Sequence, residues 1–359
     1  MSLSDPYVLR HIFVWCDESC RTPIFGVNRL WRSYYKWVNP KISYKESARM
    51  WGKLAKQLFD WCGKDFADNH LLLALIGCEA LAPCALAMLD FENINWTYAQ
   101  NAFLRLACTY GRTDVVFKLL QNRESILQNC DAIVENSDVD PAVDRNEPLQ
   151  KACQYGYLTI VNRLLENPRV DPAARGSCVI WLASQAGHLA VVERLLQDKR
   201  IDPSRNAICG ASQFGSLSIV NRLLQDKRVD PSVEENKAIR EACENGHILV
   251  VDRLLQDSRV DPACFDNDCI RKASGNGHLA VVNRLLEDPR VNPAADHSRC
   301  LIAAIVHAHE KVALRLLEDP RVDPSAENNH ALRRAIEYNL KAVVAKLEQD
   351  QRVQKKMKK

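Results

Sequence analysis

Residues 233–262 decide the fold and read VEENKAIREACENGHILVVDRLLQDSRVDP. Two apolar patterns at helical spacing lie on either side of Gly246 in this stretch. The first pattern contains Ile239 and Ala242, and the second begins at Ile248. The stretch therefore predicts a helix, a tight turn at the glycine and a second helix.

The same pattern returns along the chain, and an Asp-Pro dipeptide ends each copy. The dipeptides begin at Asp140, Asp171, Asp202, Asp230, Asp261 and Asp323, and Asn292-Pro293 fills the remaining position. The steps between them are 31, 31, 28, 31, 31 and 31 residues. A period this regular predicts an all-α solenoid of helix-turn-helix units, in which each copy buries its apolar face against its neighbours.

An alanine in the first helix aligns the copies. There are nine of them, centred on Ala74, Ala107, Ala152, Ala183, Ala211, Ala242, Ala273, Ala304 and Ala335. The turn glycine recurs at Gly111, Gly156, Gly187, Gly215, Gly246 and Gly277, and we expect it to end the first helix in a left-handed conformation. Two irregularities fall in predicted loops: about fourteen extra residues between Leu120 and Asp140, and three missing before Ala211. Such an insertion is either a specificity element or a tolerated surface loop.

These residues carry a resemblance to the ankyrin repeat. Residues 147–152, Glu-Pro-Leu-Gln-Lys-Ala, stand where ankyrins have Thr-Pro-Leu-His-x-Ala, and Gly187-His188-Leu189 and Gly277-His278-Leu279 match the Gly-His-Leu turn. The resemblance implies a solenoid over residues 67–350 that binds proteins through its concave surface. Each copy is two residues shorter than the usual ankyrin repeat, so the loops between copies should be stubbier and a binding surface should lie nearer the first helices.

The composition favours a folded intracellular protein without a nucleic-acid partner. Its 48 basic and 45 acidic residues leave a net charge of only +3, so nothing demands a polyanion. The N-terminus lacks the features of a signal peptide, which predicts that the 14 cysteines are reduced thiols in the cytoplasm or nucleus. The apolar segment 71–89 is long enough to suggest a membrane span, but Glu79 and Pro83 in its middle disfavour that interpretation.

Residues 1–66 lack the repeat and contain five of the seven tryptophans, which predicts a separate, aromatic-rich helical element. Their apolar spacing resembles an F-box, a short helical motif that docks a Skp-type adaptor of a cullin ubiquitin ligase. The anchors that match it in type and order are Val8, Leu9, Ile12, Phe13, Val27 and Trp31. The early Leu-Pro of that motif is Ser4-Asp5 here, so the alternative is a small domain that only caps the repeats.

No residue pattern indicates an enzyme, a metal or a cofactor. His11, Cys16 and Cys20 lie close together, but without a second Cys-x-x-Cys pair they are a poor zinc signature. Cysteines that follow the repeat alanine are expected to be small core residues: Cys108, Cys153 and Cys243. Histidines that follow the turn glycine are expected to bond a loop backbone: His188, His247 and His278.

Arginines recur at two positions of the repeat. One series lies in the second helix, at Arg163, Arg194, Arg222, Arg253, Arg284 and Arg315, and the other precedes the Asp-Pro step, at Arg169, Arg200, Arg228, Arg259, Arg290 and Arg321. Acidic residues recur at matching intervals, so we expect solvated ion pairs between copies, with an anionic partner as the alternative. The lysines of residues 351–359 are expected to form a solvated basic tail.

The residue three positions after the repeat alanine is the predicted contact for a protein partner, because it varies within a repeated frame. The candidates are Tyr110, Tyr155, Phe214, Asn245, Asn276, His307 and Tyr338. Exposed aromatic residues are favoured anchors for protein partners. Two hypotheses follow for a chain expected to be monomeric by itself. It is either a substrate receptor of a cullin-type ligase, which holds a ubiquitination target on the repeats, or a non-catalytic scaffold.

Overall fold

The computed structural model describes residues 76, 86, 98–127, 139–204 and 206–357. These residues are helical and contain no strand, which confirms the predicted all-α solenoid of helix-turn-helix units. The helices are α6 (Tyr98–Thr109), α7 (Thr113–Leu127), α8 (Val143–Gln154), α9 (Leu158–Leu165), α10 (Ala174–Gln185), α11 (Leu189–Gln197), α12 (Ala207–Gln213), α13 (Leu217–Leu224), α14 (Val233–Glu244), α15 (Ile248–Leu255), α16 (Cys264–Gly275), α17 (Leu279–Leu286), α18 (Ala295–Val306), α19 (Glu310–Leu316), α20 (Ala326–Glu337), α21 (Lys341–Gln349) and α22 (Gln351–Met357).

The chain divides into two compact units. The described residues up to Ala152, together with Thr159–Val170, form the first unit, and Cys153–Leu158 with the described residues from Asp171 onward form the second. The second unit contains α10 to α22 and therefore most of the repeats.

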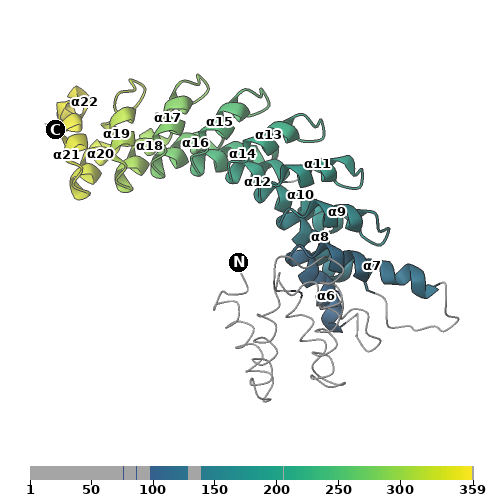
Figure 1. Cartoon of the computed structure of the whole chain (residues 1–359). Helices are drawn as coiled ribbons and strands as arrows, with labels where there is room; N and C mark the ends of the chain where they lie inside the picture. Colours follow the sequence, from purple (N-terminus) through teal and green to yellow (C-terminus); the bar gives the residue numbers. More distant parts are fainter. Residues whose placement is uncertain (1–75, 77–85, 87–97, 128–138, 205, 358–359) are drawn as a thin grey trace, which may run out of the picture. The chain divides into compact units, whose positions relative to one another are not determined.

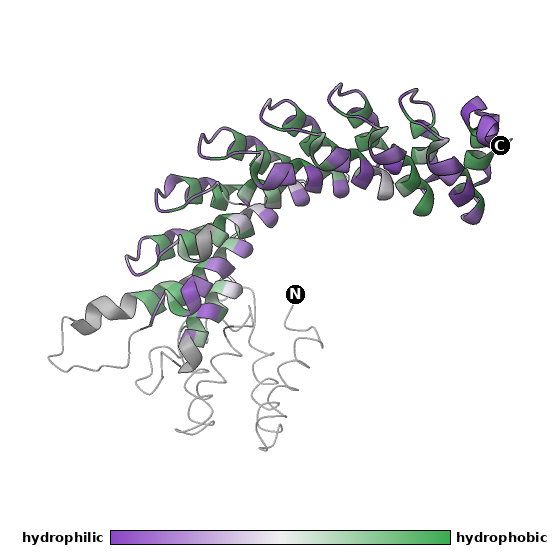
Figure 2. Cartoon of the chain, turned by 180° about the vertical axis from the view of Figure 1, so that it is seen from behind, coloured by the Kyte–Doolittle hydropathy of each residue, from purple (hydrophilic) through white to green (hydrophobic). Residues whose placement is uncertain are grey.

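Two rows of helices build the second unit. The first helices of successive copies pack on one another from α10 to α20, and the second helices form a parallel row from α11 to α21 (Figure 1). Within this unit the row of first helices lies on the inside of the curve, and the linkers project beyond the second helices (Figure 1). The second helices are largely hydrophobic and the linkers largely hydrophilic (Figure 2).

The apolar positions of each short second helix explain this packing. In α15 the residues Val250, Val251, Leu254 and Leu255 are buried, and they lie on one face of the helix. An eight-residue helix is marginal by itself, so its stability comes from the neighbours that cover this face. The structure therefore depends on stacking.

A left-handed residue ends the first helices, as the glycine pattern predicts. Gly246 has φ +77°, and where the glycine is replaced the conformation persists, at Ala308 with φ 58° and Asn339 with φ 55°. The amide of the next residue, His247, donates to the carbonyl of Ala242, and the second helix begins one residue later. This turn reverses the chain within three residues.

Three consecutive left-handed residues at the start of several first helices are a feature that the sequence interpretation missed. They are Asp144–Asn146 in α8, Glu234–Asn236 in α14, Phe265–Asn267 in α16, Asp296–Ser298 in α18 and Glu327–Asn329 in α20. The third residue of each is asparagine or serine and is buried. Asparagine tolerates this conformation better than most residues, because its short polar side chain bonds locally.

The third residue of these turns also holds the next linker. Asn236 Oδ1 accepts from the amide of Asp261 at 2.8 Å, and Ser298 Oγ accepts from the amide of Asp323 at 3.0 Å. The aspartate of the linker in turn accepts from the amide two residues later, as Asp261 Oδ1 does from Ala263 at 2.9 Å. The linkers at Asp261 and Asp323 are therefore fixed from both sides.

The arginine series before the Asp-Pro step corrects one expectation. Arg169 does pair with Asp140 of the preceding copy, at 3.0 Å, but the other ion pairs of the series lie within a copy: Arg321 Nη2 and Asp319 Oδ2 are 2.8 Å apart. The contacts between copies are instead made with backbone carbonyls, because the same guanidinium donates to Val291 O at 3.1 Å and to Leu286 O at 2.9 Å. Buried carbonyls at helix ends need donors, and a guanidinium supplies several in a fixed geometry.

The other arginine series does connect side chains of successive copies. Arg284 Nε donates to Asp252 at 2.6 Å, which is an ion pair, whereas Arg253 donates to the neutral Asn221 at 2.9 Å. The expected charged network between copies is therefore partly a network of neutral acceptors.

The copy with the deletion and the copy with the insertion depart only locally from the repeated structure. In the copy that lacks three residues, α12 has only seven residues, and Gly210 makes room for Trp181 of the preceding copy. The insertion begins after α7, which extends to Leu127, and residues 128–138 lie outside the described part. At the other end residues 351–357 form α22, in which Val353 is buried against the last repeat and Lys355 and Lys356 are exposed, as expected of a solvated basic segment.

Candidate protein-binding surface

The predicted contact positions all lie at the end of a first helix and are exposed. Phe214, Asn245, Asn276, His307 and Tyr338 are the C-cap residues of α12, α14, α16, α18 and α20. The side chain of Phe214 is 52% exposed, and Tyr110, Tyr155 and Tyr338 are also exposed large apolar residues. Six of the seven positions belong to the second unit, and Tyr110 belongs to the first.

Polar contacts hold several of these side chains. Asn276 Nδ2 donates to the carbonyl of Glu244 in the preceding copy at 2.8 Å, and Asn245 Nδ2 donates to Glu241 O of its own helix at 2.9 Å. The rings of Tyr155 and Tyr157 stack with centroids 6.3 Å apart. A side chain that is already ordered loses less conformational entropy when it binds.

A histidine of the following copy supports the helix end beneath these residues. His247 Nε2 lies 2.9 Å from the carbonyl of Gln213, and His278 Nε2 lies 2.9 Å from that of Glu244. His188 makes the same contact with Gln154 O at 3.1 Å. The expectation of a backbone contact is confirmed, but the acceptor belongs to the last turn of the preceding first helix and not to a loop.

Phe265 and Arg240 form a further exposed feature that the sequence interpretation missed. Phe265 is 55% exposed, and the guanidinium carbon of Arg240 lies 4.5 Å from its ring centroid. The same position is acidic in other copies, at Asp144, Glu234, Asp296 and Glu327. In the sequence, the signal for this feature is an aromatic residue at a position where other copies have a carboxylate. This signal appears only when the copies are aligned on their left-handed turns.

A buried carboxylate lies beside this aromatic residue. The side chain of Asp268 is 6% exposed and pairs with Arg271, while Arg240 and Lys272 lie at 3.7 Å and 3.8 Å. The buried carboxylate restrains the three cationic side chains around it, because moving them away would leave its charge buried and unpaired. Arg240 is therefore held in place by Asp268 while it stacks on Phe265.

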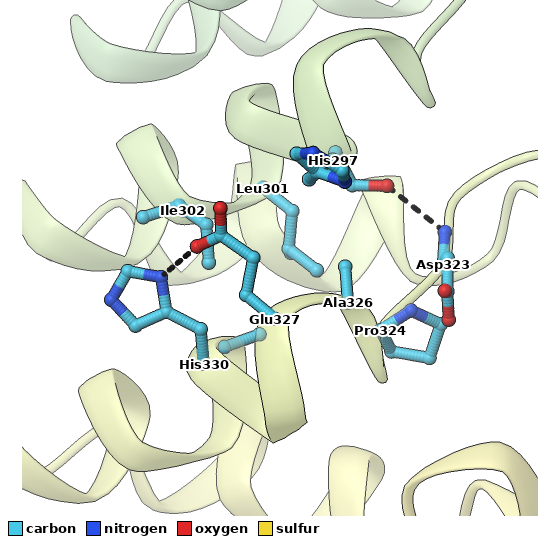
Figure 3. A pocket seen from close by; sticks show the side chains of 10 residues that line it. His297, Leu301, Ile302, Asp323, Pro324, Ala326, Glu327 and His330 are labelled. Atoms are coloured by element: carbon cyan, nitrogen blue, oxygen red, sulfur yellow. Dashed lines mark hydrogen bonds and ion pairs between the residues drawn. The ribbon is translucent and has the colours of Figure 1, made fainter.

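The grooves between first helices differ along the array. Between α16 and α18 an open groove of about 560 Å³ is lined by Phe265, Asp268, Arg271, Asp296 and Arg299, among others. The equivalent space between α18 and α20 is about 10 Å³ (Figure 3).

Side chains fill the narrow groove between α18 and α20. In Figure 3 His330 bonds Glu327 at 3.1 Å, and Ile302 lies at the position that Arg271 occupies one copy earlier. The two grooves thus differ in volume, although the residues around them occupy equivalent positions of the repeat.

The described cysteines fit structural roles. Cys108, Cys153 and Cys243 are completely buried, as expected of small core residues. Burial raises the pKa of the Cys108 thiol far above its ordinary range, which disfavours a nucleophilic thiolate. Among the residues that the structure describes, no group of three His, Cys, Asp or Glu side chains is placed to hold a metal.

Several predicted residues lie outside the described part of the chain. They are the F-box-like anchors Val8, Leu9, Ile12, Phe13, Val27 and Trp31, the cluster His11, Cys16 and Cys20, and the first repeat alanine, Ala74. Within the residues that the structure does describe, none of the helices has the length and hydropathy that a membrane span requires.

Comparison with known protein families identifies the repeat. The family described as ankyrin repeats (3 copies) matches residues 104–207 and 180–266. No curated protein matches the chain. Ankyrin repeats are protein–protein interaction modules and are generally not catalytic. Residues 104–266 therefore consist of ankyrin repeats, and helix-turn-helix copies in the same register continue to residue 349.

Proposed function

We propose that the chain is a substrate receptor of a cullin-type ubiquitin ligase. Residues 1–66 would bind a Skp-type adaptor through Val8, Leu9, Ile12, Phe13, Val27 and Trp31, which follow the F-box spacing. The repeats would hold the protein to be ubiquitinated. Both contacts are between proteins and need neither a cofactor nor a catalytic residue of this chain.

One observation carries the target-binding half of the proposal. Aromatic or polar side chains differ from copy to copy at the C-cap of the first helix, while the residues around this position repeat. Exposed tyrosine and phenylalanine on a rigid frame supply large contact areas at a small entropic cost. The position therefore combines variation with order, as a specificity surface requires.

The cysteines support a cytoplasmic or nuclear location. Cys108, Cys209, Cys243, Cys264, Cys269 and Cys300 are thiols. Cys269 lies beside Cys243 and Cys264 in one cluster of thiols. This state fits a reducing compartment.

A pull-down tests the adaptor half of the proposal. Purified Skp-type adaptor is mixed with the intact chain, with a chain that lacks residues 1–40, and with an Ile12→Glu/Trp31→Glu variant. We expect the intact chain alone to retain the adaptor. Retention by all three, or by none while circular dichroism shows folded repeats, would contradict the ligase proposal and favour the ankyrin scaffold.

Substitutions at the C-caps test the target half. Tyr155→Ser, Phe214→Ser and Tyr338→Ser are combined in one chain, and the matched control is Leu249→Ser, which removes a side chain that is 64% exposed on a second helix. Bound proteins from a eukaryotic cell extract are quantified for both. The triple variant should lose the proteins that wild type and control retain, without loss of helicity.

A further inference from the structure

The last copy leaves open a position that every other described copy covers. The residue after the repeat alanine is completely buried in seven copies: Cys108, Cys153, Ser184, Ser212, Cys243, Ser274 and Ile305. Its counterpart Ile336 is 58% exposed. The last copy therefore keeps an isoleucine where solvent contact would favour a polar residue.

The missing cover is a further first helix. Ile305 lies in α18, which packs against α20, and no equivalent helix follows α20 in the described residues. The chain does begin the next linker, because Arg352 pairs with Asp350 and donates to Val322 O at 3.0 Å, as Arg321 does one copy earlier. At Gln354 it departs from the pattern and continues as α22, with its amide bonded to Asp350 O.

Asn329 of the last copy is bonded differently from its counterparts Asn236 and Asn267. Asn236 Oδ1 and Asn267 Oδ1 each accept from the amide of the next linker, at 2.8 Å and 2.6 Å. The corresponding Asn329 is 7% exposed, its Nδ2 donates to Val353 O at 3.1 Å, and its Oδ1 has no hydrogen-bond partner among the described residues. Val353 of α22 therefore takes the place of the linker that bonds Asn236 and Asn267.

The arginines of the array indicate the charge of that partner. Arg105 bonds Asp144 and Glu147 of the following copy, at 2.8 Å and 2.9 Å, and Arg240 lies 3.7 Å from Asp268 of the copy after it. Arg333 occupies the same register and, like Arg240, donates to the carbonyls that begin its own helix. In the described part of the chain, no carboxylate pairs with Arg333.

The net charge of the last copy also favours an acidic partner. Residues 326–357 contain seven lysines and arginines and four aspartates and glutamates, so they alone carry a net charge equal to that of the whole chain. A basic C-terminal segment disfavours a second copy of itself and favours an acidic partner.

We propose that the C-terminal end of the repeat stack binds an acidic helix of a partner protein, which adds as a further first helix. The helix places a small or apolar side chain on Ile336 and a carboxylate on Arg333. In the array the carboxylate that meets this arginine precedes the small residue by five positions, as Asp268 precedes Ala273 and Glu147 precedes Ala152. This site uses other residues than the C-cap surface, although Tyr338 is the C-cap of the same helix, and it is independent of the ligase proposal.

A peptide from the chain itself supplies the probe. It copies residues 261–276, carries fluorescein, and has Cys264→Ala and Cys269→Ala to prevent disulfides. Fluorescence anisotropy is measured with the intact chain and with Ile336→Glu, Arg333→Glu and the control Leu249→Glu. We expect Ile336→Glu and Arg333→Glu each to weaken binding by about tenfold or more, and the control to leave it unchanged.

A charge reversal on the peptide makes the test specific. A peptide with Asp268→Lys should bind wild type about tenfold more weakly and recover on Arg333→Glu. Absence of binding up to the solubility limit of the acidic peptide, or equal binding by Ile336→Glu, would overturn the proposal. Sedimentation velocity that shows a dimer of the intact chain, lost in Ile336→Glu, would also overturn it by assigning the face to a second copy.

Discussion

Gly246 is required for two separate reasons, and only one of them is visible in the sequence. Its φ of +77° is strained for any residue with a β-carbon. In addition, a β-carbon at this position would lie 2.5 Å from Nδ1 of His278 in the next copy. Gly187 shares the backbone conformation, but Ser216 replaces the histidine there, and the nearest atom would be 3.4 Å away.

The two glycines can therefore separate backbone strain from crowding. Gly187→Ala should lower the free energy of unfolding by about 1 kcal/mol, and Gly246→Ala by about 3 kcal/mol, because the histidine must also move. Urea denaturation followed by circular dichroism measures both. Adding His278→Ala to Gly246→Ala should recover part of the loss, and equal effects of the two single substitutions would refute the role of crowding.

The aspartates that pair with the arginines before the Asp-Pro steps make the free energy of unfolding depend on pH. Hydrogen bonds from the arginine two residues later lower the pKa of each carboxyl below its ordinary value; the residues are Asp198, Asp226, Asp257, Asp288, Asp319 and Asp350. An unfolded aspartate has a pKa of about 3.9. The pairs therefore stabilise the fold fully above that pH, and this contribution is lost as pH falls through the lowered pKa of the folded state.

Replacing one of these aspartates tests the linkage. The side chain of Asp288 is 8% exposed, so Asp288→Asn should lower the free energy of unfolding at neutral pH and reduce its fall between pH 5 and about pH 2. The comparison is Asp296→Asn, whose side chain is 44% exposed and pairs on the surface with Arg299. Parallel pH curves for wild type and Asp288→Asn would contradict the assignment.

The left-handed turn is the element that joins one copy to the next. In α16 Asn267 combines a φ of 63° with a bond from its Oδ1 to the amide of Asn292. Asn267→Gly keeps the conformation and loses the bond, whereas Asn267→Ala loses both. We expect the free energy of unfolding to fall by about 1 to 2 kcal/mol for glycine and about 1 kcal/mol more for alanine, in urea titrations. A glycine variant less stable than the alanine variant would contradict this account.

The helices and their order could be predicted from the sequence, but the left-handed turn at the start of the first helices could not. The 31-residue period, the turn glycines and the buried alanines follow from local rules, and the structure confirms them over the described copies. The left-handed turn depends on a donor in the next copy, so the local preference of Glu234 and Glu235 gives no sign of it. Bonds from arginine to backbone carbonyls are invisible for the same reason, because carbonyl acceptors occur at every residue.

The sequence predicted where the candidate surface lies, but it did not predict all of the residues that belong to it. Variation at Phe214 and Tyr338 located the exposed C-caps. Phe265, Arg240 and the groove beside them depend on which residues of adjacent copies meet, and this required the alignment of the first helices in space.

At the scale of the whole molecule, stacking separates the residues that hold the array from those that vary on its surface. Arg321 bonds two carbonyls of the preceding copy, and the same contact recurs at Arg290. Each copy of a solenoid is stabilised mainly by its neighbours. Variants of the frame should therefore change stability, and variants of the C-cap surface should change binding.

A paired measurement on two variants tests this central claim most directly. The first combines Tyr155→Ser, Phe214→Ser and Tyr338→Ser, and the second is Arg321→Ala. The urea midpoint of unfolding and the amount of protein retained from a eukaryotic cell extract are determined for each. We predict that the triple variant unfolds at the wild-type midpoint and loses the bound protein, while Arg321→Ala unfolds at lower urea and, under native conditions, still binds. A triple variant that retains all of the bound protein would contradict the account.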